Sequence, residues 1–355
     1  MDELRYGVIG TGMMGVEHIE NVNALDGAVV TAIADPHPQS RDAGQAAAAG
    51  SVQVYADHQA LLDSGSVDAV VVASPNMTHI EVLRDVLATD IPVLIEKPMC
   101  TTVEDCKEVI ELAEGRAGLV WVGLEYRYMP PVARLIEELG TGIAGAVQMV
   151  AIREHRFPFL VKVGDWNRFS ENTGGTLVEK CCHFFDLMTL LSGGSPTRVM
   201  ASGGQSVNHL DEVYDGRRSD ILDNAYVIVE YDNGVRGMLD LCMFAEATHN
   251  QEEISVVGDQ AKLEALIPEN VVRIGRRGHH FIGDVEIHSV SDDTVLHEGL
   301  HHGSSYIEHR NFADAVRTGG EPEVSLWDGL LSVAVGAAAH KAIDEGRPVS
   351  MDEVL

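Results

Sequence analysis

Two short segments of the chain carry side chains that could move a proton and stabilise an oxyanion. Lys97 stands between an acid and a proline at the end of an apolar run, a place where packing does not demand a lysine. Glu179, His183 and Asp186 are spaced i, i+4 and i+7 in a segment that we predict to be helical, so they would share one helix face. A histidine beside a carboxylate is a suitable general base, although a solvated polar face explains the same spacing.

A glycine-rich turn follows the first strand-like run, Tyr6–Ile9. Gly10, Gly12 and Gly15 form a G-x-G-x-x-G motif there, and Asp35 follows twenty residues after the last glycine, at the end of a second apolar run. This is the full context of a dinucleotide-binding turn. Gly10 would permit the tight turn, Gly12 the approach of backbone to a pyrophosphate, and Gly15 the close packing of helix on strand. The helix N-terminus would add N–H groups and a positive dipole end.

Asp35 also indicates which dinucleotide is bound. Its carboxylate can accept hydrogen bonds from the ribose hydroxyls of NAD. A 2′-phosphate would bring like charges within about 4 Å, at a cost of about 4 kcal/mol per unit pair near a surface. Arg41 is the nearby cation and is more typical of a solvated helix residue. We therefore predict NAD as the cofactor, with NADP less favoured.

Composition narrows the class of protein. The chain has 355 residues, 45% of them apolar, which suits two domains. Its 55 acidic and 25 basic residues give a net charge of −30, so nucleic acid and anionic membranes are poor partners. No apolar stretch approaches the length of a membrane span, and a strand beginning by Arg5 leaves no room for a signal peptide.

Cysteine and histidine usage predicts neither disulfides nor a metal site. The five cysteines are odd in number and lack a C-x-x-C pair. The histidine pairs 279–280 and 301–302 lack the spacing of metal ligands on one helix face. We expect a cytoplasmic protein without a bound metal.

Residues 1–124 alternate short β-branched runs with helical patterns, which predicts an α/β Rossmann domain with a parallel sheet. The expected strands are 6–9, 29–34, 69–73, 92–95 and 119–123, and the expected helices are 13–25, 39–49, 78–88 and 103–114. The glycine turn, residues 74–79 and residues 96–98 follow three of these strands and should meet in one crevice. The predicted cofactor-binding residues are Gly10, Thr11, Gly12, Met13, Met14, Gly15, Asp35, Ser74, Pro75, Asn76, His79, Glu96 and Lys97.

Residues 125–355 are predicted to form an α+β domain with a large, mostly antiparallel open sheet. The expected strands are 147–153, 199–205, 224–231, 234–244, 253–257 and 262–266, and the expected helices are 131–139, 176–191, 304–318 and 325–344. One sheet face would be covered by the helix at 176–191, and the last two helices would pack back across the domain junction. The other face would then be free to form a homodimer or homotetramer.

These motifs together resemble the Gfo/Idh/MocA family of oxidoreductases over essentially the whole chain. The resemblance rests on the glycine turn, Ser74-Pro75-Asn76 with His79, Glu96-Lys97-Pro98, Gly174-Gly175 with His183 and Asp186, and Val256-Val257-Gly258. It implies hydride exchange between NAD(P) and a hydroxyl of a sugar or cyclitol. It also implies that Lys97 binds that hydroxyl and a nicotinamide ribose, and that His183 takes the proton. Glu179 stands where the family commonly has Asp, so its part in catalysis rests on a longer side chain.

Several residues could hold a polyol substrate. Arg127 resembles a basic substrate-side position of the family, Trp166 and Asn167 lie in a loop suited to stacking on a sugar ring, and His155 and His302 could complete the pocket. Burial of Lys97 or crowding by positive charge would lower its pKa and let it share the base role. Besides a dehydrogenase, the sequence allows a redox-neutral enzyme that cleaves glycosides by transient oxidation at C3. A sugar or dinucleotide sensor is the third alternative, and it would need neither Lys97 nor His183.

Overall fold

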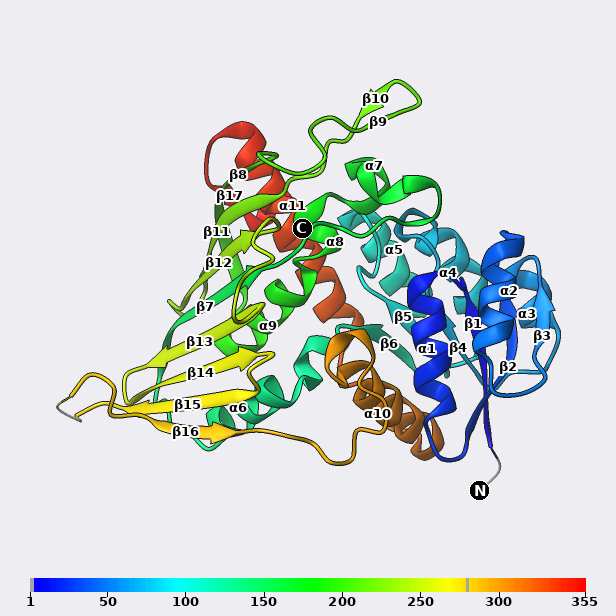
Figure 1. Cartoon of the computed structure of the whole chain (residues 1–355), viewed down its shortest axis with the longest axis horizontal. Helices are drawn as coiled ribbons and strands as arrows, with labels where there is room; N and C mark the ends of the chain where they lie inside the picture. Colours follow the sequence, from blue (N-terminus) through cyan, green and yellow to red (C-terminus); the bar gives the residue numbers. More distant parts are fainter. Residues whose placement is uncertain (1–2, 279–280) are drawn as a thin grey trace.

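The computed structural model describes residues 3–278 and 281–355, and its N-terminal part is built on a six-stranded parallel sheet (Figure 1). The strand order is β3-β2-β1-β4-β5-β6, the order of a dinucleotide-binding sheet. The strands are β1 (Leu4–Ile9), β2 (Ala28–Ala34), β3 (Gln53–Tyr55), β4 (Ala69–Val72), β5 (Val93–Glu96) and β6 (Val120–Gly123). Their near-continuous apolar sequences suit a sheet with helices on both faces, and every residue of β4 and β5 is buried.

Helices follow the strands as the alternation predicts. They are α1 (Met13–Asn23), α2 (Pro38–Ala47), α3 (His58–Asp63), α4 (His79–Leu87) and α5 (Val103–Ala113), with a 3₁₀ turn, η1 (Asn76–Thr78), before α4. Side chains cap two of them, since Asp57 accepts from the amide of Ala60 and Thr102 from that of Asp105. The sequence missed β3 and α3, because three and six residues are too few to display a hydrophobic period.

The C-terminal part carries a mixed sheet of nine strands. Its order is β16-β15-β14-β13-β7-β12-β11-β8-β17, in which β7 and β12 are parallel and the other neighbours antiparallel. The strands are β7 (Val147–His155), β8 (Pro196–Gly204), β11 (Asn224–Tyr231), β12 (Arg236–Cys242), β13 (Glu252–Gly258), β14 (Ala261–Ile267), β15 (Val271–Arg276), β16 (Glu286–Ser289) and β17 (Val349–Ser350). A separate hairpin pairs β9 (Val213–Tyr214) with β10 (Arg217–Arg218).

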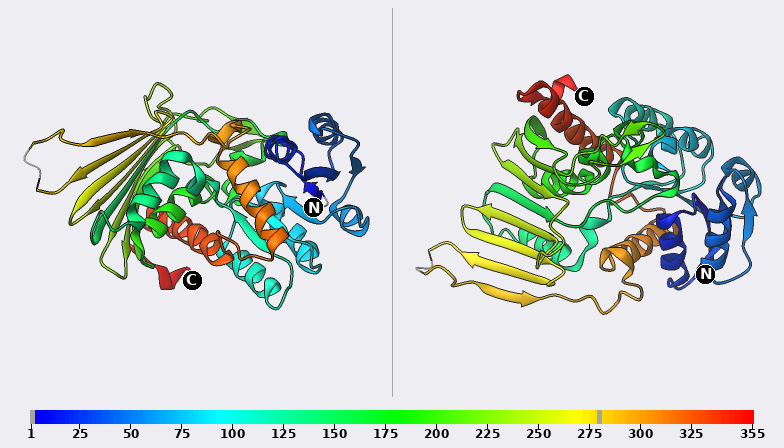
Figure 2. Two further views of the ribbon diagram at one scale, coloured as in Figure 1. Left: turned by 90° about the horizontal axis from the view of Figure 1, so that it is seen from below. Right: turned by 45° about the horizontal axis from the view of Figure 1, so that its top comes forward.

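Helices cover one face of this sheet and connect it to the parallel sheet. They are α6 (Pro130–Gly140), α7 (Ser170–Thr173), α8 (Thr176–Glu179), α9 (Cys182–Ser192), α10 (Ser304–Thr318) and α11 (Leu326–Glu345), with 3₁₀ turns η2 (Glu125–Tyr128), η3 (Val163–Arg168), η4 (Gly299–His301) and η5 (Met351–Glu353). Helix α9 packs on β7 and β12, α6 on β14, and α11 on β8. Figures 1 and 2 show α10 and α11 lying between the sheets, where α11 also contacts α5 and β6, and α10 contacts α1.

The prediction of one helix over 176–191 is wrong, because the segment breaks between α8 and α9. Cys181 has ψ −3°, and the amide of Phe184 bonds to the carbonyl of Cys181 in a 3₁₀ pattern. The ammonium of Lys180 points into the protein and binds the hydroxyl of Tyr126 at 2.6 Å. Glu179, Lys180, His183 and Asp186 of this segment are all buried, so they do not form a solvated polar face.

The other face of the nine-stranded sheet carries exposed apolar side chains. Strand β11 alternates buried and accessible residues, as a half-covered strand must. Accessible large side chains on the neighbouring strands β7, β12 and β11 are Met149, Tyr226, Ile228 and Met238, and Ile287 is accessible on the edge strand β16. In residues 3–278 and 281–355, no helix is long and apolar enough to cross a membrane.

Candidate functional site

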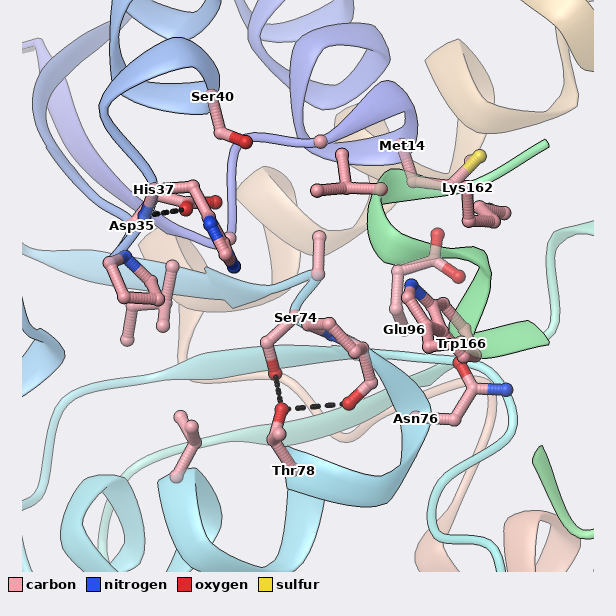
Figure 3. Close-up of a pocket in the computed structure, with 18 of the residues that line it drawn as sticks. Met14, Asp35, His37, Ser40, Ser74, Asn76, Thr78, Glu96, Lys162 and Trp166 are labelled. Carbon is pink, nitrogen blue, oxygen red and sulfur yellow. Dashed lines mark hydrogen bonds between the residues drawn. The ribbon is translucent and has the colours of Figure 1, made fainter. Parts of the chain in front are cut away.

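A cavity of about 520 Å³ opens beyond the carboxyl ends of β1, β4 and β5 (Figure 3). It lies between β1 and β4, where the strand order reverses and such sheets bind ligands. The structure brings together here the glycine turn, the loop after β4 and the Glu96–Lys97 segment. Predicted residues on its wall are Gly10, Gly12, Met13, Met14, Asp35, Ser74, Pro75, Asn76, Glu96, Lys97, Trp166 and Glu179.

Each glycine of the turn is needed for a different steric reason. Gly10 has φ +88°, and a Cβ there would meet the backbone of Ser74 at 2.6 Å. A Cβ at Gly15 would lie 1.9 Å from the carbonyl oxygen of Gly10, so only glycine lets α1 begin so close to the turn. A Cβ at Gly12 would have no described atom of another element within 4 Å, which leaves the backbone open toward the cavity. These roles are those that a pyrophosphate-binding turn requires.

Asp35 is held with both carboxylate oxygens fixed. Oδ2 accepts from the amide of Thr11 at 2.8 Å, and Oδ1 accepts from the amide of His37 at 2.8 Å. The guanidinium of Arg41 donates to the carbonyls of Asp35 and Pro36, at 2.7 and 3.0 Å. The carboxylate is therefore aimed by the glycine turn itself, and Arg41 is engaged with backbone beside it.

Two residues of the loop after β4 support the cavity in different ways. The amide nitrogen Nδ2 of Asn76 is buried and has no hydrogen-bond partner within the described parts of the chain, so it is available to a ligand. His79 instead lies behind the wall, where Nδ1 is 3.0 Å from the carbonyl of Pro98 and Nε2 is 3.0 Å from that of Ser74. His79 thus joins two ligand-binding loops and fixes their spacing.

The cavity fits a nicotinamide dinucleotide on these observations. The open backbone at Gly12, the aimed carboxylate of Asp35 and the unpaired amide of Asn76 match the pyrophosphate, the ribose hydroxyls and a polar end group. Lys162 and Trp166, which belong to the C-terminal part of the chain, form the opposite wall of the cavity (Figure 3). Nζ of Lys162 lies 5.9 Å from the centre of the indole ring of Trp166.

Lys97 lies at the inner end of the cavity beside Glu179. Its Nζ donates to the carbonyl oxygen of Glu179 at 3.5 Å. Burial alone would lower the pKa of Lys97, but the surrounding acidic groups, among them Cys182 and Glu96, outweigh burial and raise it. Lys97 is thus a cation, and the conditional expectation that it shares the base role is not met. Burial raises the pKa of the Glu179 carboxyl to about 7, against the opposing pull of Lys162 and Lys97.

His183 is buried next to this lysine. Burial lowers its pKa well below the usual value, and the positive charges of Lys97 and Lys180 lower it further. Its ring stacks on Tyr126, with centroids 3.9 Å apart and planes 8° apart. The imidazole is therefore neutral, so one ring nitrogen is free to accept a proton, and the stack on Tyr126 fixes the plane of the ring.

Glu96 connects the site to the helices of the parallel sheet. Its Oε1 lies 2.8 Å from Nε2 of His18, and its Oε2 accepts from the amide of Lys97 at 3.0 Å. Burial opposes ionisation of Glu96, but His18 prevails and lowers its pKa to about 2. The second nitrogen of His18 lies 2.7 Å from His309. Glu96 thus positions the backbone of Lys97 as a buried carboxylate.

The structure brings only one of the predicted substrate ligands, Trp166, to the cavity wall. Asn167 is fully buried and donates to the carbonyl of Leu160 at 3.0 Å, which braces the loop that carries Trp166. His155 points to the open side of the sheet, where Nε2 is 3.2 Å from Asp240. His302 follows η4 with φ 54°. A direct role of these three in substrate binding stays a prediction.

Arg127 lies in a buried ion pair rather than on the cavity wall. Its Nε donates to Asp186 at 2.7 Å, and its Nη2 contacts Asp186 and, at 3.3 Å, Asp328. The pair joins η2, α9 and α11, so Asp186 orients Arg127 and not His183. The expected role of Arg127 as a substrate ligand stays a prediction too.

Several wall residues were missed by the sequence analysis. His37, His58 and Lys162 face the cavity, and Tyr126 and Lys180 support His183 from behind. Their only signal was a polar residue near a strand end or in a loop without periodicity. His279 and His280 lie outside the described residues, and within residues 3–278 and 281–355 no three His, Cys, Asp or Glu side chains are placed to hold a metal ion.

Fold and site together define a dinucleotide-dependent oxidoreductase, with a Rossmann sheet whose glycine turn lines the same cavity as Lys97 and a second domain built on an open sheet. Two family models match the chain, "Oxidoreductase family, NAD-binding Rossmann fold" over residues 4–124 and "Oxidoreductase family, C-terminal alpha/beta domain" over residues 136–351. The chain belongs to the Gfo/Idh/MocA oxidoreductase family, and its N-terminal domain is NAD-binding.

Several known proteins are similar to this chain over nearly its whole length. The myo-inositol 2-dehydrogenase of Thermotoga maritima is 28% identical over 361 residues, which covers 99% of this chain and 100% of that protein. Inositol 2-dehydrogenase 2 of Saccharopolyspora erythraea is 30% identical over 358 residues, covering 97% and 94%. Levoglucosan dehydrogenase, solved in complex with NADH and levoglucosan, has a TM-score of 0.85 at 18% identity, covering 99% and 100%, which shows a common fold.

Proposed function

We propose that the protein oxidises a secondary hydroxyl of a cyclitol, a monosaccharide or a small glycoside with NAD⁺. The observation that supports the proposal is a cationic Lys97 on the wall of the dinucleotide cavity, with a neutral, buried His183 close enough for the charge of Lys97 to lower its pKa. A polyol is favoured because the wall offers hydrogen-bonding side chains together with the aromatic ring of Trp166. The inositol dehydrogenases that the chain resembles support the same substrate class.

The side chains divide the work of alcohol oxidation. Bound NAD⁺ supplies the hydride acceptor. The ammonium of Lys97 donates a hydrogen bond to the reacting hydroxyl and stabilises alkoxide character as the proton leaves. Neutral His183 takes that proton, and Tyr126 keeps its ring in one orientation. Glu179, with its pKa raised to about 7 by burial, would bind a substrate hydroxyl or partner His183.

The test is a substrate panel read by two signals. Wild-type protein is incubated with NAD⁺ and with inositols, aldoses and aryl glycosides, while NADH absorbance and release of the aryl group are followed. NADH formation from a polyol supports the proposal. Aryl release without NADH would point to redox-neutral glycoside cleavage. Saturable binding with neither signal would identify a sensor.

We also infer that the protein is a cytoplasmic homodimer or homotetramer assembled through the open face of the nine-stranded sheet. The exposed side chains of Met149, Tyr226 and Met238 lie on neighbouring strands of that face and would be buried by a second copy. Five free thiols suit a reducing compartment. Light scattering of wild type and of a Tyr226→Glu variant tests the assembly, because a charge in the interface should release monomers.

A further inference from the structure

Glu125 is a buried carboxylate that the proposed mechanism leaves without a task. It begins η2, directly after the Rossmann sheet, and only 1% of its surface is exposed. Neither of its carboxylate oxygens accepts a hydrogen bond from any other residue that the structure describes. A carboxylate in such a place costs several kcal/mol unless it has charged partners or holds a proton. The groups around Glu125 should therefore show whether it is paired with a charge or holds a proton.

Two imidazoles flank the same oxygen of Glu125. Oε1 lies 3.8 Å from Nε2 of His183 and 3.8 Å from Nδ1 of His301. Nδ1 of His301 is in turn 3.3 Å from Oε1 of Glu17 on α1. These distances exceed a hydrogen bond by less than about 1 Å, a gap that catalytic groups close when substrate binds. Glu125 is thus the bridge between the general base and His301 of η4.

The residues on the two sides of Glu125 differ in their exposure to solvent. His183 is 1% exposed, and the bound cofactor and substrate would fill the cavity that Lys97 and Glu179 line. The side chain of His301 keeps 19% of its surface exposed. Glu125 and His301 therefore link the buried His183 to a partly exposed side chain, and neither of the two lines the cavity.

The charged groups around Glu125 allow it both to accept and to release a proton. Lys97 and Glu96 face it from the end of β5, His183 from α9, His301 from η4 and Glu308 from α10. Burial raises the pKa of Glu125, while His301 and Lys97 hold the rise in check. Burial also lowers the pKa of His183, so an imidazolium there gives its proton up readily.

We propose that Glu125 and His301 form a proton relay that carries the alcohol proton from His183 to solvent. The proposal rests on the proposed function, in which the O–H bond of the substrate breaks and an N–H bond forms on His183. That N–H then breaks as Glu125 becomes a carboxylic acid. Glu125 passes the proton to Nδ1 of His301 in the tautomer whose own hydrogen is on Nε2, and the new Nδ1–H donates to the Glu17 carboxylate. The proton on the other nitrogen of His301 leaves to water. One proton is released for each hydride transferred, and the reverse order supplies a proton for ketone reduction.

The turnover test compares when NADH and the proton appear. Stopped-flow mixing with NAD⁺ and the polyol that wild type oxidises fastest records NADH absorbance and a pH-indicator dye together. In wild type both signals rise together. Glu125→Gln keeps the shape of the side chain but cannot carry a proton, so we expect proton release to lag NADH and kcat to fall about tenfold or more. The solvent isotope effect on kcat should rise, with KM and the Kd for NAD unchanged.

The matched control is Glu252→Gln, which alters an equally buried carboxylate on β13 whose charged neighbours are Glu154 and Lys180 rather than Glu125. It should leave proton release synchronous with NADH. His301→Asn changes the relay at its outer, partly exposed end and should reproduce the lag with less risk to folding. Synchronous signals and near-wild-type kcat in both Glu125→Gln and His301→Asn would overturn the relay.

An infrared titration of the free protein tests the relay without turnover, and so separates its failure from failure of the proposed function. The band of protonated Glu125 is the carboxyl band lost in Glu125→Gln. Because His301 favours the ionised form of Glu125, His301→Asn should shift the titration midpoint of that band upward, by about one pH unit. An unchanged midpoint would show that the two groups do not share protons, whether or not any polyol is oxidised.

Discussion

The imidazole of His183 lies flat against the phenol ring of Tyr126, with ring centroids 3.9 Å apart and an interplanar angle of 8°. The phenol is itself anchored, because Lys180 donates to its hydroxyl at 2.6 Å. Lys180 in turn pairs with the buried Glu154 at 3.2 Å. A stack of aromatic rings held by a buried ion pair fixes the plane of the base before substrate arrives, which is how a supporting residue contributes to rate.

Two replacements of Tyr126 distinguish the effect of its ring contact with His183 from that of its hydrogen bond to Lys180. Tyr126→Leu removes the ring against which His183 rests, and we expect kcat for polyol oxidation to fall about tenfold or more because the base loses its orientation. Tyr126→Phe keeps the ring and loses only the bond to Lys180, so its loss should stay within about threefold. Steady-state kinetics and a Kd for NAD by fluorescence measure both. Equal activity of the Leu variant and wild type would show that the stack has no catalytic role.

Cofactor choice should depend on the charge of Asp35. In Asp35→Asn the side chain still accepts a backbone hydrogen bond but no longer repels a 2′-phosphate, so the ratio of NADP to NAD affinity should rise about a hundredfold. Titration with both dinucleotides gives that ratio. Asp42→Asn makes the same charge change on an exposed residue of α2 and should leave it unaltered. A ratio that stays constant in both variants would mean that Asp35 does not face the ribose.

Lys97 should be required for chemistry and dispensable for cofactor binding. Lys97→Met removes the cation that stabilises the substrate oxygen as its proton leaves. We therefore expect kcat to fall about a thousandfold or more. Binding of NAD should persist, because the glycine turn and Asp35 are untouched. Lys107→Met, a substitution of a lysine on α5 remote from the cavity, is the control. Turnover by Lys97→Met near the wild-type rate would remove the basis of the proposed function.

The sequence predicted what depends on local pattern. The glycine turn, Asp35 and the buried parallel strands follow short-range rules of backbone and spacing, and the structure places them as those rules require. The relation of Glu125 to His183 and His301 could not be predicted in the same way, since η2, α9 and η4 meet only in the folded chain. Arg127 and Asp186 were assigned from their neighbours in sequence, yet they bind each other.

Errors in the predicted elements also have physical causes. A helical wheel over 176–191 assumes a constant 100° per residue, and the 3₁₀ turn at Cys181 changes that rotation. Strands β15 and β16 were missed, and β16 is a short, largely exposed edge strand without a buried face to mark it. The break in the helix and the pairing of the edge strand both depend on tertiary contacts, which a local sequence pattern does not contain.

Stability should fall as pH rises because of a carboxyl pair in the sheet. Glu252 on β13 lies opposite Glu154 on β7, both fully buried, and burial followed by the charge of Glu154 raises the pKa of Glu252 to about 8 from an ordinary value of 4.5. Between these values the folded protein holds a proton that the unfolded chain has released. Since stability rises with pH only where the unfolded state binds more protons, this group makes stability fall over that window.

Glu252→Gln removes the titration and should flatten that decline. The variant should gain at least about 1.4 kcal/mol relative to wild type between about pH 5 and about pH 9, because each unit of pKa shift contributes that much. Thermal melts followed by circular dichroism across this range measure the difference. Glu253→Gln, next along β13 but on the open face and paired with Arg153, should run parallel to wild type. Parallel curves for Glu252→Gln and wild type would show that Glu252 is ionised in the folded protein throughout.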